Sequence, residues 1–217
     1  MRNQKWIAGI LCCCMTFLLL TGCGSGKADN SEAEETPAVT ETVTETPTPT
    51  AAATATQTPA ETTPPEEVAF NQQIISGDGI CQLTFPENWT DMKGQLNAEL
   101  ALEAGCLDEE EFLTLLGEAK EGSSLENLGE YTDVLVNYIS ASFTNPVVGD
   151  REELEINGKK ATKTKITGVT SDVEVVYWVY TIEGTKQYVQ ICTWTTPGNA
   201  ATGEGIFDKI VQSYTEL

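Results

Sequence analysis

Apolar and polar residues alternate along much of the chain after residue 67, and this alternation predicts a series of β-strands. Two such runs, 70–75 and 80–85, flank a Ser-Gly-Asp-Gly turn at 76–79, whose glycines supply the positive φ that a tight hairpin needs. A second hairpin is predicted at 153–166, where Asn157-Gly158 is the signature of a type I′ turn. These hairpins predict antiparallel strand pairs.

A third hairpin, 173–195, carries aromatic residues whose faces depend on the length of its turn. Its first strand, 173–182, is apolar on both faces, which predicts a central place in the sheet. A three-residue turn at 183–185 puts four aromatic side chains on one face, whereas a two-residue turn separates them, because a one-residue slip flips every side chain. These side chains are Trp178, Tyr180, Tyr188 and Trp194. One shared face would be either core beneath a helix, which we expect, or an aromatic binding face for a ligand.

Helical periodicity is clearest between residues 125 and 142, where apolar side chains recur every three to four positions. Ser123 and Glu126 have the spacing of a capping box at the start of this helix, and Asn145-Pro146 ends it. Residues 207–214 predict a second, shorter amphipathic helix. The domain therefore combines hairpins with two helices.

Two segments fit both a helix and a strand. Residues 96–105 and 112–119 alternate with a period of two, yet they are rich in Leu, Ala and Glu, which favour helices. The residues alone do not decide between the two. Four consecutive acidic residues at 108–111 predict a solvated turn; a calcium site is the alternative, but the Asp-x-Asn-x-Asp-Gly spacing is missing. No metal site and no cofactor are expected.

The start of the chain has the pattern of a lipoprotein export signal. Arg2 and Lys5 precede an uncharged apolar run at 6–20, which is shorter than the roughly 20 residues of a membrane-spanning helix. Leu20-Thr21-Gly22-Cys23 closes the run and resembles the bacterial lipobox, in which the first three residues are recognised by the signal peptidase and the cysteine receives a diacylglycerol. We therefore expect a signal peptide at 1–22 and lipidation (palmitate) at Cys23.

Composition divides the rest of the chain into a tether and a globular domain. Residues 23–67 are Thr, Pro, Glu and Ala with almost no large apolar side chain, so this segment is expected to be a disordered linker after the lipidated cysteine. From Val68 the composition becomes that of a folded domain, 68–217, large enough for one hydrophobic core.

Charge and cysteine content limit the possible partners and chemistry. The chain has a net charge of −21, of which 24 acidic and nine basic residues give −15 to residues 68–217. No nucleic acid is expected as a partner, because the domain repels phosphates. Lys159, Lys163 and Lys165 share one face of a predicted strand, which we expect to be solvated.

The sequence contains no histidine, which excludes histidine-dependent nucleophiles, general bases and zinc sites and leaves only carboxylate or Ser-Lys chemistry. An enzyme is therefore not expected. Three cysteines, Cys81, Cys106 and Cys192, fall in the domain and are expected to be small buried thiols.

Several of these motifs follow one another as they do in a known family. The order is Phe85-Pro86-x-x-Trp89, a helix, Ile156-Asn157-Gly158-Lys159-Lys160-Ala161, Val176-Tyr177-x-x-Tyr180 and Phe207-x-x-Ile210-x-x-Ser213-Tyr214. This order resembles the PsbP-like domains, which include LpqN-type lipoproteins. The resemblance implies an α+β fold in which an antiparallel sheet is covered by helices on both faces, an α/β/α sandwich. It also implies strands at 96–104 and 112–119.

The expected protein is a lipoprotein on the extracytoplasmic face of the cell membrane, of Gram-positive type. Its domain is expected to be a non-enzymatic binding or accessory domain at the cell surface. The membrane is contacted through the diacylglycerol on Cys23, and the second partner is an unknown protein or small ligand. The alternative is a ligand-binding lipoprotein that serves a transporter or an envelope enzyme.

Overall fold

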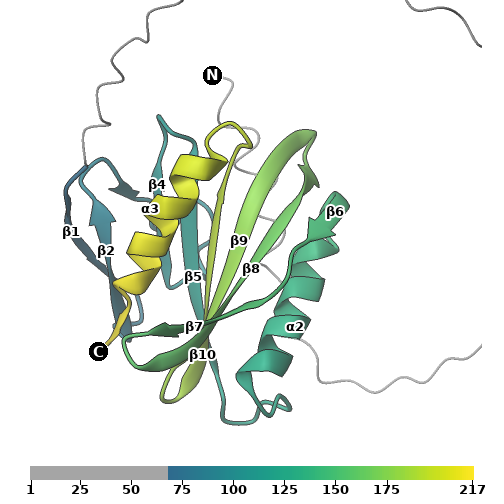
Figure 1. Ribbon diagram of the computed structural model, residues 1–217. Helices are drawn as coiled ribbons and strands as arrows, with labels where there is room; N and C mark the ends of the chain where they lie inside the picture. The colour runs from purple at the N-terminus through teal and green to yellow at the C-terminus, as the bar shows by residue number, and fades with distance from the viewer. Residues whose placement is uncertain (1–67) are drawn as a thin grey trace, which may run out of the picture. The chain divides into compact units, whose positions relative to one another are not determined.

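The computed structural model describes residues 68–217, so the predicted signal peptide, the predicted lipidation site Cys23 and the predicted linker lie outside the described residues. Two helices and eleven strands follow one another in the described part (Figure 1). In chain order they are β1 (Phe70–Ile75), β2 (Cys81–Pro86), β3 (Thr90–Asp91), β4 (Leu102–Cys106), β5 (Glu111–Ala119), α2 (Leu128–Ser140), β6 (Thr144–Val148), β7 (Glu152–Ile156), β8 (Lys159–Thr170), β9 (Val173–Glu183), β10 (Gln187–Thr195), α3 (Ala200–Gln212) and β11 (Thr215–Glu216).

The strands form one large and one small antiparallel sheet. The large sheet has the order β3-β4-β5-β10-β9-β8-β6, and β7 also pairs with β8. Strand β9 lies between β8 and β10, and nearly all of its residues are buried, as expected for a strand that is apolar on both faces. The small sheet has the order β1-β2-β11. The three predicted hairpins are therefore present.

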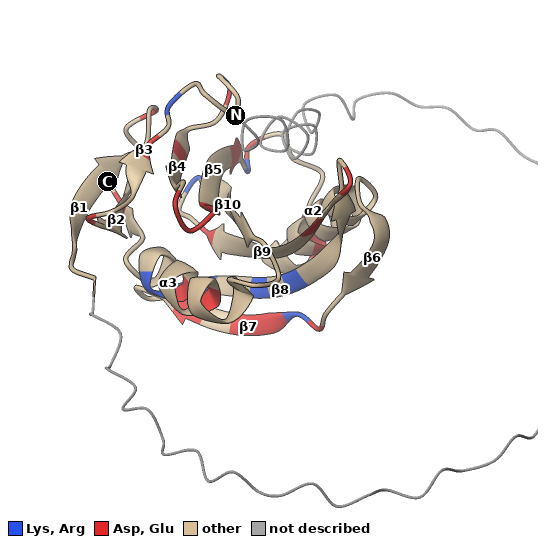
Figure 2. Ribbon diagram, turned by 90° about the horizontal axis from the view of Figure 1, so that it is seen from above, with Lys and Arg blue, Asp and Glu red and all other residues tan. Residues whose placement is uncertain are grey.

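The two helices lie on opposite sides of the large sheet (Figure 2). Beneath α2, a core cluster includes Tyr131, Leu135 and Ile139 of the helix. Beneath α3 and the small sheet, a second cluster includes Phe207 and Ile210. The fold is therefore α+β, with an antiparallel sheet covered on both faces, as the sequence predicts.

Helix α2 begins later than its predicted capping box. Its N-cap is Asn127, whose side chain accepts a hydrogen bond from Glu130 N at 3.0 Å, and the Glu130 carboxylate accepts one from Glu126 N at 2.9 Å. Ser123 Oγ instead accepts from Leu125 N within the preceding turn. The predicted box at Ser123 is wrong, because Asn127 caps the helix about one turn later and Glu130 bonds back to the residue before this cap.

The segment expected as a strand at 96–104 is strand only from Leu102. A buried carboxylate, Glu103, accepts hydrogen bonds from the backbone N–H groups of 95, 96 and 97 at 3.1, 2.9 and 2.8 Å. These bonds hold the chain before β4 in a loop, so its donors are not available to a neighbouring strand. The other ambiguous segment, 112–119, lies within β5 and is a strand.

Candidate functional site

The four aromatic residues of the β9–β10 hairpin do not share a face. Trp178 is paired with Thr193, and Trp194 is paired with Tyr177, because four residues, an even number, separate the paired positions Glu183 and Tyr188. Trp178 and Tyr180 therefore belong to the cluster beneath α3, and Tyr188 and Trp194 to the cluster beneath α2. The alternative of a three-residue turn, which would bring all four together, is therefore wrong, and so is the shared aromatic face that depended on it.

Both tryptophans lie inside the protein. Trp178 is fully buried, and its ring centroid is 5.4 Å from that of Phe207 in α3. Trp194 is 2% exposed and stacks on Phe112 at 5.5 Å and on Tyr177 at 5.6 Å. These rings are core contacts and present no surface to a ligand.

A charged cluster lies between β8 and α3. Lys163 Nζ donates hydrogen bonds to Glu204 at 2.7 Å and to Asp208 at 3.0 Å, and Tyr180 Oη donates to Asp208 at 2.8 Å. Only 8% of the Lys163 side chain is exposed, so the solvated lysine face that we expected is wrong at this position. Helix α3 covers it, because Glu204 and Asp208 stand one helical turn apart above the strand.

The cluster is electrostatically satisfied. Burial lowers the pKa of Lys163, but its hydrogen bonds to Glu204 and Asp208 outweigh burial, and the net pKa is raised. Burial is the largest single influence on Glu204 and raises its pKa, but the hydrogen bond to Lys163 and the charges of Lys163 and Lys165 together outweigh burial, and the net pKa is lowered. The ion pairs of Lys163 with Glu204 and Asp208 therefore connect α3 to the sheet.

One buried carboxyl group has no such partner. Glu111 is 2% exposed, and Oε2 has no hydrogen-bond partner. Burial, with a smaller contribution from Glu109, raises the pKa of Glu111 to about 7. A carboxyl with this pKa is suited to acid–base chemistry, but Glu111 lines none of the three hollows described below. The solvated turn expected at 108–111 is a turn at 107–110, but the expectation is wrong for Glu111, which is buried as the first residue of β5.

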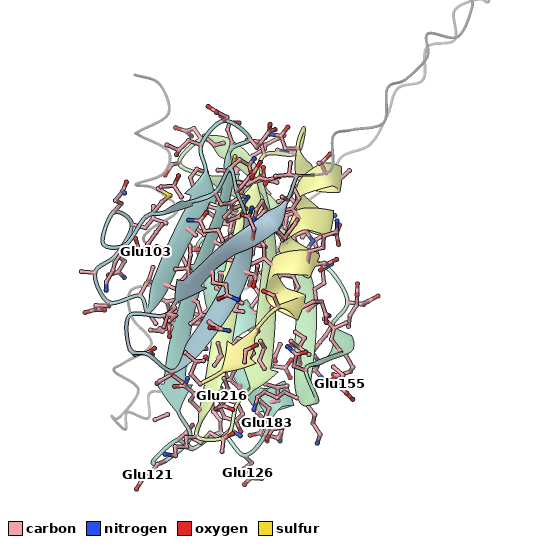
Figure 3. The ribbon with its side chains drawn as sticks, turned by 90° about the vertical axis from the view of Figure 1, so that its left-hand side faces the viewer. Glu103, Glu121, Glu126, Glu155, Glu183 and Glu216 are labelled. Atoms are coloured by element: carbon pink, nitrogen blue, oxygen red, sulfur yellow. The ribbon has the colours of Figure 1, made fainter. Side chains whose placement is uncertain are left out.

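Three open hollows of the described residues have volumes of about 600, 430 and 410 Å³. The largest of these three lies where the β7–β8 turn, the β9–β10 turn and β11 meet, and most of the residues that line it are polar. Glu216 at its rim is held by Lys159, and its carboxylate also accepts bonds from Thr185 N at 2.9 Å and Thr185 Oγ1 at 2.7 Å. Figure 3 shows Glu216 near Glu183 at this end of the domain.

The small sheet next to this hollow presents an uncharged face. The register pairs Gln73 with Thr84, and it pairs Gln82 with Ile75 on one side and Thr215 on the other, so these five side chains point to the same side. Their partly or fully exposed positions lie opposite the buried residues Ile74, Leu83 and Cys81. We call these five residues the small-sheet face; Figure 2 shows β1 without a charged residue.

Two exposed apolar side chains mark this region. Ile75 is 58% exposed, and Leu217, whose backbone N–H donates to Ile80 O, is 60% exposed. In a domain with a net charge of −15, an uncharged surface that carries exposed apolar groups is the feature expected of a protein-binding site. The sequence contains the signal for it, since β1 has no charged residue, but only the register shows which side chains share a face.

The other sequence predictions for this domain concern metals, thiols and membranes. In residues 68–217, no group of three His, Cys, Asp or Glu residues is arranged to hold a metal ion. Cys81, Cys106 and Cys192 are buried and form no disulfide with one another, and burial raises the pKa of Cys81 and Cys106. Neither α2 nor α3 has the length and apolar character to span a membrane.

Comparison with solved structures identifies the fold. No family model and no curated protein matches this sequence. The solution structure of cyanobacterial PsbP (CyanoP) from Synechocystis superposes with a TM-score of 0.51 and 15% identity, over 72% of this chain and 98% of that one. The fold is PsbP-like. Mycobacterium tuberculosis LpqN, involved in cell envelope biogenesis, superposes with a TM-score of 0.49 and 8% identity, over 70% of this chain and 92% of that one.

Proposed function

We propose that this protein is an extracytoplasmic lipoprotein, anchored by a diacylglycerol on Cys23, whose PsbP-like domain is a non-enzymatic binding or accessory domain for a partner protein at the cell surface. The observation that carries the proposal is the order of segments in the sequence. A cationic start and a short apolar run end at Leu20-Thr21-Gly22-Cys23, and a 44-residue Thr/Pro-rich segment, 24–67, separates that cysteine from the domain.

The small-sheet face supports a protein as the partner. Apolar and uncharged polar groups form the centre of protein interfaces, where charged residues are depleted. On the proposed tether, this face can contact a partner at a distance from the membrane, since a flexible chain of 44 residues spans roughly 35–40 Å. The ligand-binding alternative loses its aromatic face, because Trp178 and Trp194 lie on opposite sides of the sheet. Its remaining candidate is the hollow of about 600 Å³ beside Glu216.

The anchor is tested by replacing the cysteine. Cys23→Ala removes the only thiol that the lipobox places for acylation, so the variant should incorporate no radiolabelled palmitate and should keep its signal peptide. Cys14→Ala, within the apolar run, is the matched control and should be labelled like the parent. Equal labelling of the Cys23→Ala variant would remove the lipoprotein proposal.

The binding surface is tested by photo-cross-linking in intact cells. A photo-reactive amino acid that replaces Ile75 should yield a discrete protein adduct, whereas the same residue in place of Leu107 should not. The two sites are matched, because Ile75 is 58% and Leu107 is 55% exposed, but only Ile75 belongs to the small-sheet face. Equal adducts at both sites, or none at Ile75, would argue against this surface and leave the hollow as the candidate.

A further inference from the structure

A hollow of about 410 Å³ lies between α2 and the connection from β6 to β7, and it shares no lining residue with the hollow beside Glu216. Helix α2 contributes one wall, residues 148–151 contribute the other, and Thr164 of β8 also lines it. Three elements that are distant in sequence thus enclose one polar site.

Thr164 is the first sign that the hollow has a ligand. The residue is 3% exposed, and Oγ1 has no hydrogen-bond partner in the described structure. A buried hydroxyl without a partner is unfavourable, and most such groups in folded proteins are paired. Three buried threonines beneath α2, Thr132, Thr162 and Thr181, bond to one another at 2.7–3.2 Å. The hydroxyls of Thr193 and Thr195 on β10 also lack a partner, but neither residue lines one of the three hollows described above.

The charge of the lining shows which kind of ligand fits. Arg151 donates from Nη1 to Asp133 at 2.8 Å and from Nε to Glu153 at 3.1 Å, so two carboxylates already neutralise its guanidinium. Asp150, next to it in the lining, forms no ion pair within residues 68–217. The lining residues Asp133, Asp150 and Arg151 therefore have a net charge of −1, Glu153 beside them adds a further negative charge, and the surrounding domain is itself strongly acidic. The excess charge favours a cation and disfavours an anion.

Apolar groups stand beside these oxygen atoms. Val136 of α2 and Val148 at the end of β6 both line the hollow, and 43% of Val148 is exposed although it is apolar. The site therefore combines a short apolar wall with acceptor atoms from Asp150, Asn137 and Thr164. A hydrated metal ion would gain no favourable contact from the two valines.

We propose that this hollow binds a primary ammonium group at the end of an alkyl chain. The methylene groups pack against Val136 and Val148, and the ammonium group, which has three N–H donors, bonds to the oxygens of Asp150, Asn137 and Thr164. Two sources carry this chemistry: the lysine side chain of a protein and a free alkylamine. The inference does not depend on the lipid anchor or on the small-sheet face.

The test titrates the full chain in detergent with two probes and follows backbone amide NMR shifts. One probe is the capped peptide Gly-Lys-Gly, and the other is cadaverine; the peptide with acetylated lysine is the control ligand. Saturable shifts are expected at residues 132–137 and 148–151 with a probe that carries the ammonium, and none with the acetylated peptide. Binding of the peptide alone identifies protein lysine, and binding of cadaverine alone, or of both probes equally, identifies a free amine as a sufficient ligand.

Three variants complete the test. Asp150→Asn should weaken binding about tenfold or more, because it removes the charged acceptor. Thr164→Val should weaken binding a few-fold without lowering the unfolding midpoint, since the hydroxyl has no partner to lose. Asp172→Asn changes the net charge equally at an exposed site with φ of 63°, which Asn tolerates, and should bind like the parent. No saturable shift, equal binding of the acetylated peptide, or equal losses at Asp150 and Asp172 would overturn the proposal.

Discussion

Helices α2 and α3 each cover one face of the large sheet, but the groups that they cover differ. Beneath the middle of α2, the hydrogen bonds are neutral: Thr132 Oγ1 donates to Leu128 O at 2.8 Å and shares hydrogen bonds with Thr162 and Thr181. On the same side, the carboxyl group of Glu118 bonds to Tyr131. The aromatic rings on that side are stacked, with Tyr131 on Tyr188 at 4.8 Å. The contact between α2 and the sheet therefore depends mainly on packing and on uncharged hydrogen bonds.

Beneath α3, charged groups are part of the packing. Lys163 is enclosed by Glu204 and Asp208, and Glu111 lies against the first turn of the helix, where a Cβ on Gly203 would come within 3.0 Å of its Oε1. Coulomb interactions weaken with salt and change with protonation, whereas apolar burial does neither. We infer that the stability of this domain responds to pH and salt mainly through the α3 side.

The largest effects are expected where the two sides are alike. Trp178→Ala on the α3 side and Trp194→Ala on the α2 side should each lower the free energy of unfolding by about 3–5 kcal/mol, because both rings are buried and leave a cavity. Denaturant melts of the two variants measure this loss. An unchanged midpoint for either variant would mean that its ring lies at the surface, and the assignment of that ring to the core would be wrong.

A smaller effect on stability, which depends on pH, should distinguish the α3 side from the α2 side. The pKa of Glu111 is raised to about 7 in the fold by burial and by Glu109, from 4.5 in the unfolded chain. A raised carboxyl pKa gives stability that is fully present below the unfolded value and is lost as the pH rises through the folded value. The positive end of α3 beside the carboxylate offsets part of this loss.

Glu111→Gln should therefore stabilise the domain by on the order of 2 kcal/mol at about pH 8 and by little at about pH 4. Urea melts of parent and variant across this range give the difference. Glu99→Gln, at an exposed position, is the control, and its stability relative to the parent should be about the same at both pH values. A variant that gains nothing at high pH would show that the Glu111 carboxylate is stabilised by a contact other than those described.

Sequence patterns predict the hairpins of this fold because their turn residues act locally. Asn157 and Gly158 have φ of 50° and 77°, as a type I′ turn requires, and the strands on both sides pair as expected. The face of each aromatic residue was not predictable, because it depends on whether the β9–β10 turn has an odd or an even number of residues. A single residue in the turn reverses that outcome.

The charged cluster beneath α3 was missed for a different reason. Lys163 and Lys165 alternate with buried residues on β8, a pattern that a solvated strand face also shows. Their partner Glu204 lies about 40 residues later in the sequence, so no local pattern connects them. The signal that was present is the four-residue spacing of Glu204 and Asp208 in a helix that otherwise turns apolar residues to the sheet. Only the placement of α3 over β8 brings the two patterns together.

The smallest expected effect is a difference between the two sides in how their contribution to stability depends on salt. Lys163→Met keeps the apolar stem but leaves Glu204 and Asp208 without their cation, and it should cost about 1–2 kcal/mol in low salt, since both acids are partly exposed. Thr132→Val on the α2 side removes neutral hydrogen bonds and should cost about 1 kcal/mol.

Unfolding midpoints of these two variants and the parent, measured in low salt and in concentrated sodium chloride, decide whether the difference between the two sides is electrostatic. The loss from Lys163→Met should shrink in concentrated salt, because screening weakens the interaction that the parent still has, while the loss from Thr132→Val should stay constant. Lys160→Ala, at an exposed position on the same strand, is the control and should change the midpoint little in either condition. A loss at Lys163 that is independent of salt would mean that its stem packs α3 to the sheet and its charge does not, and the two sides of the sheet would then be stabilised in the same way.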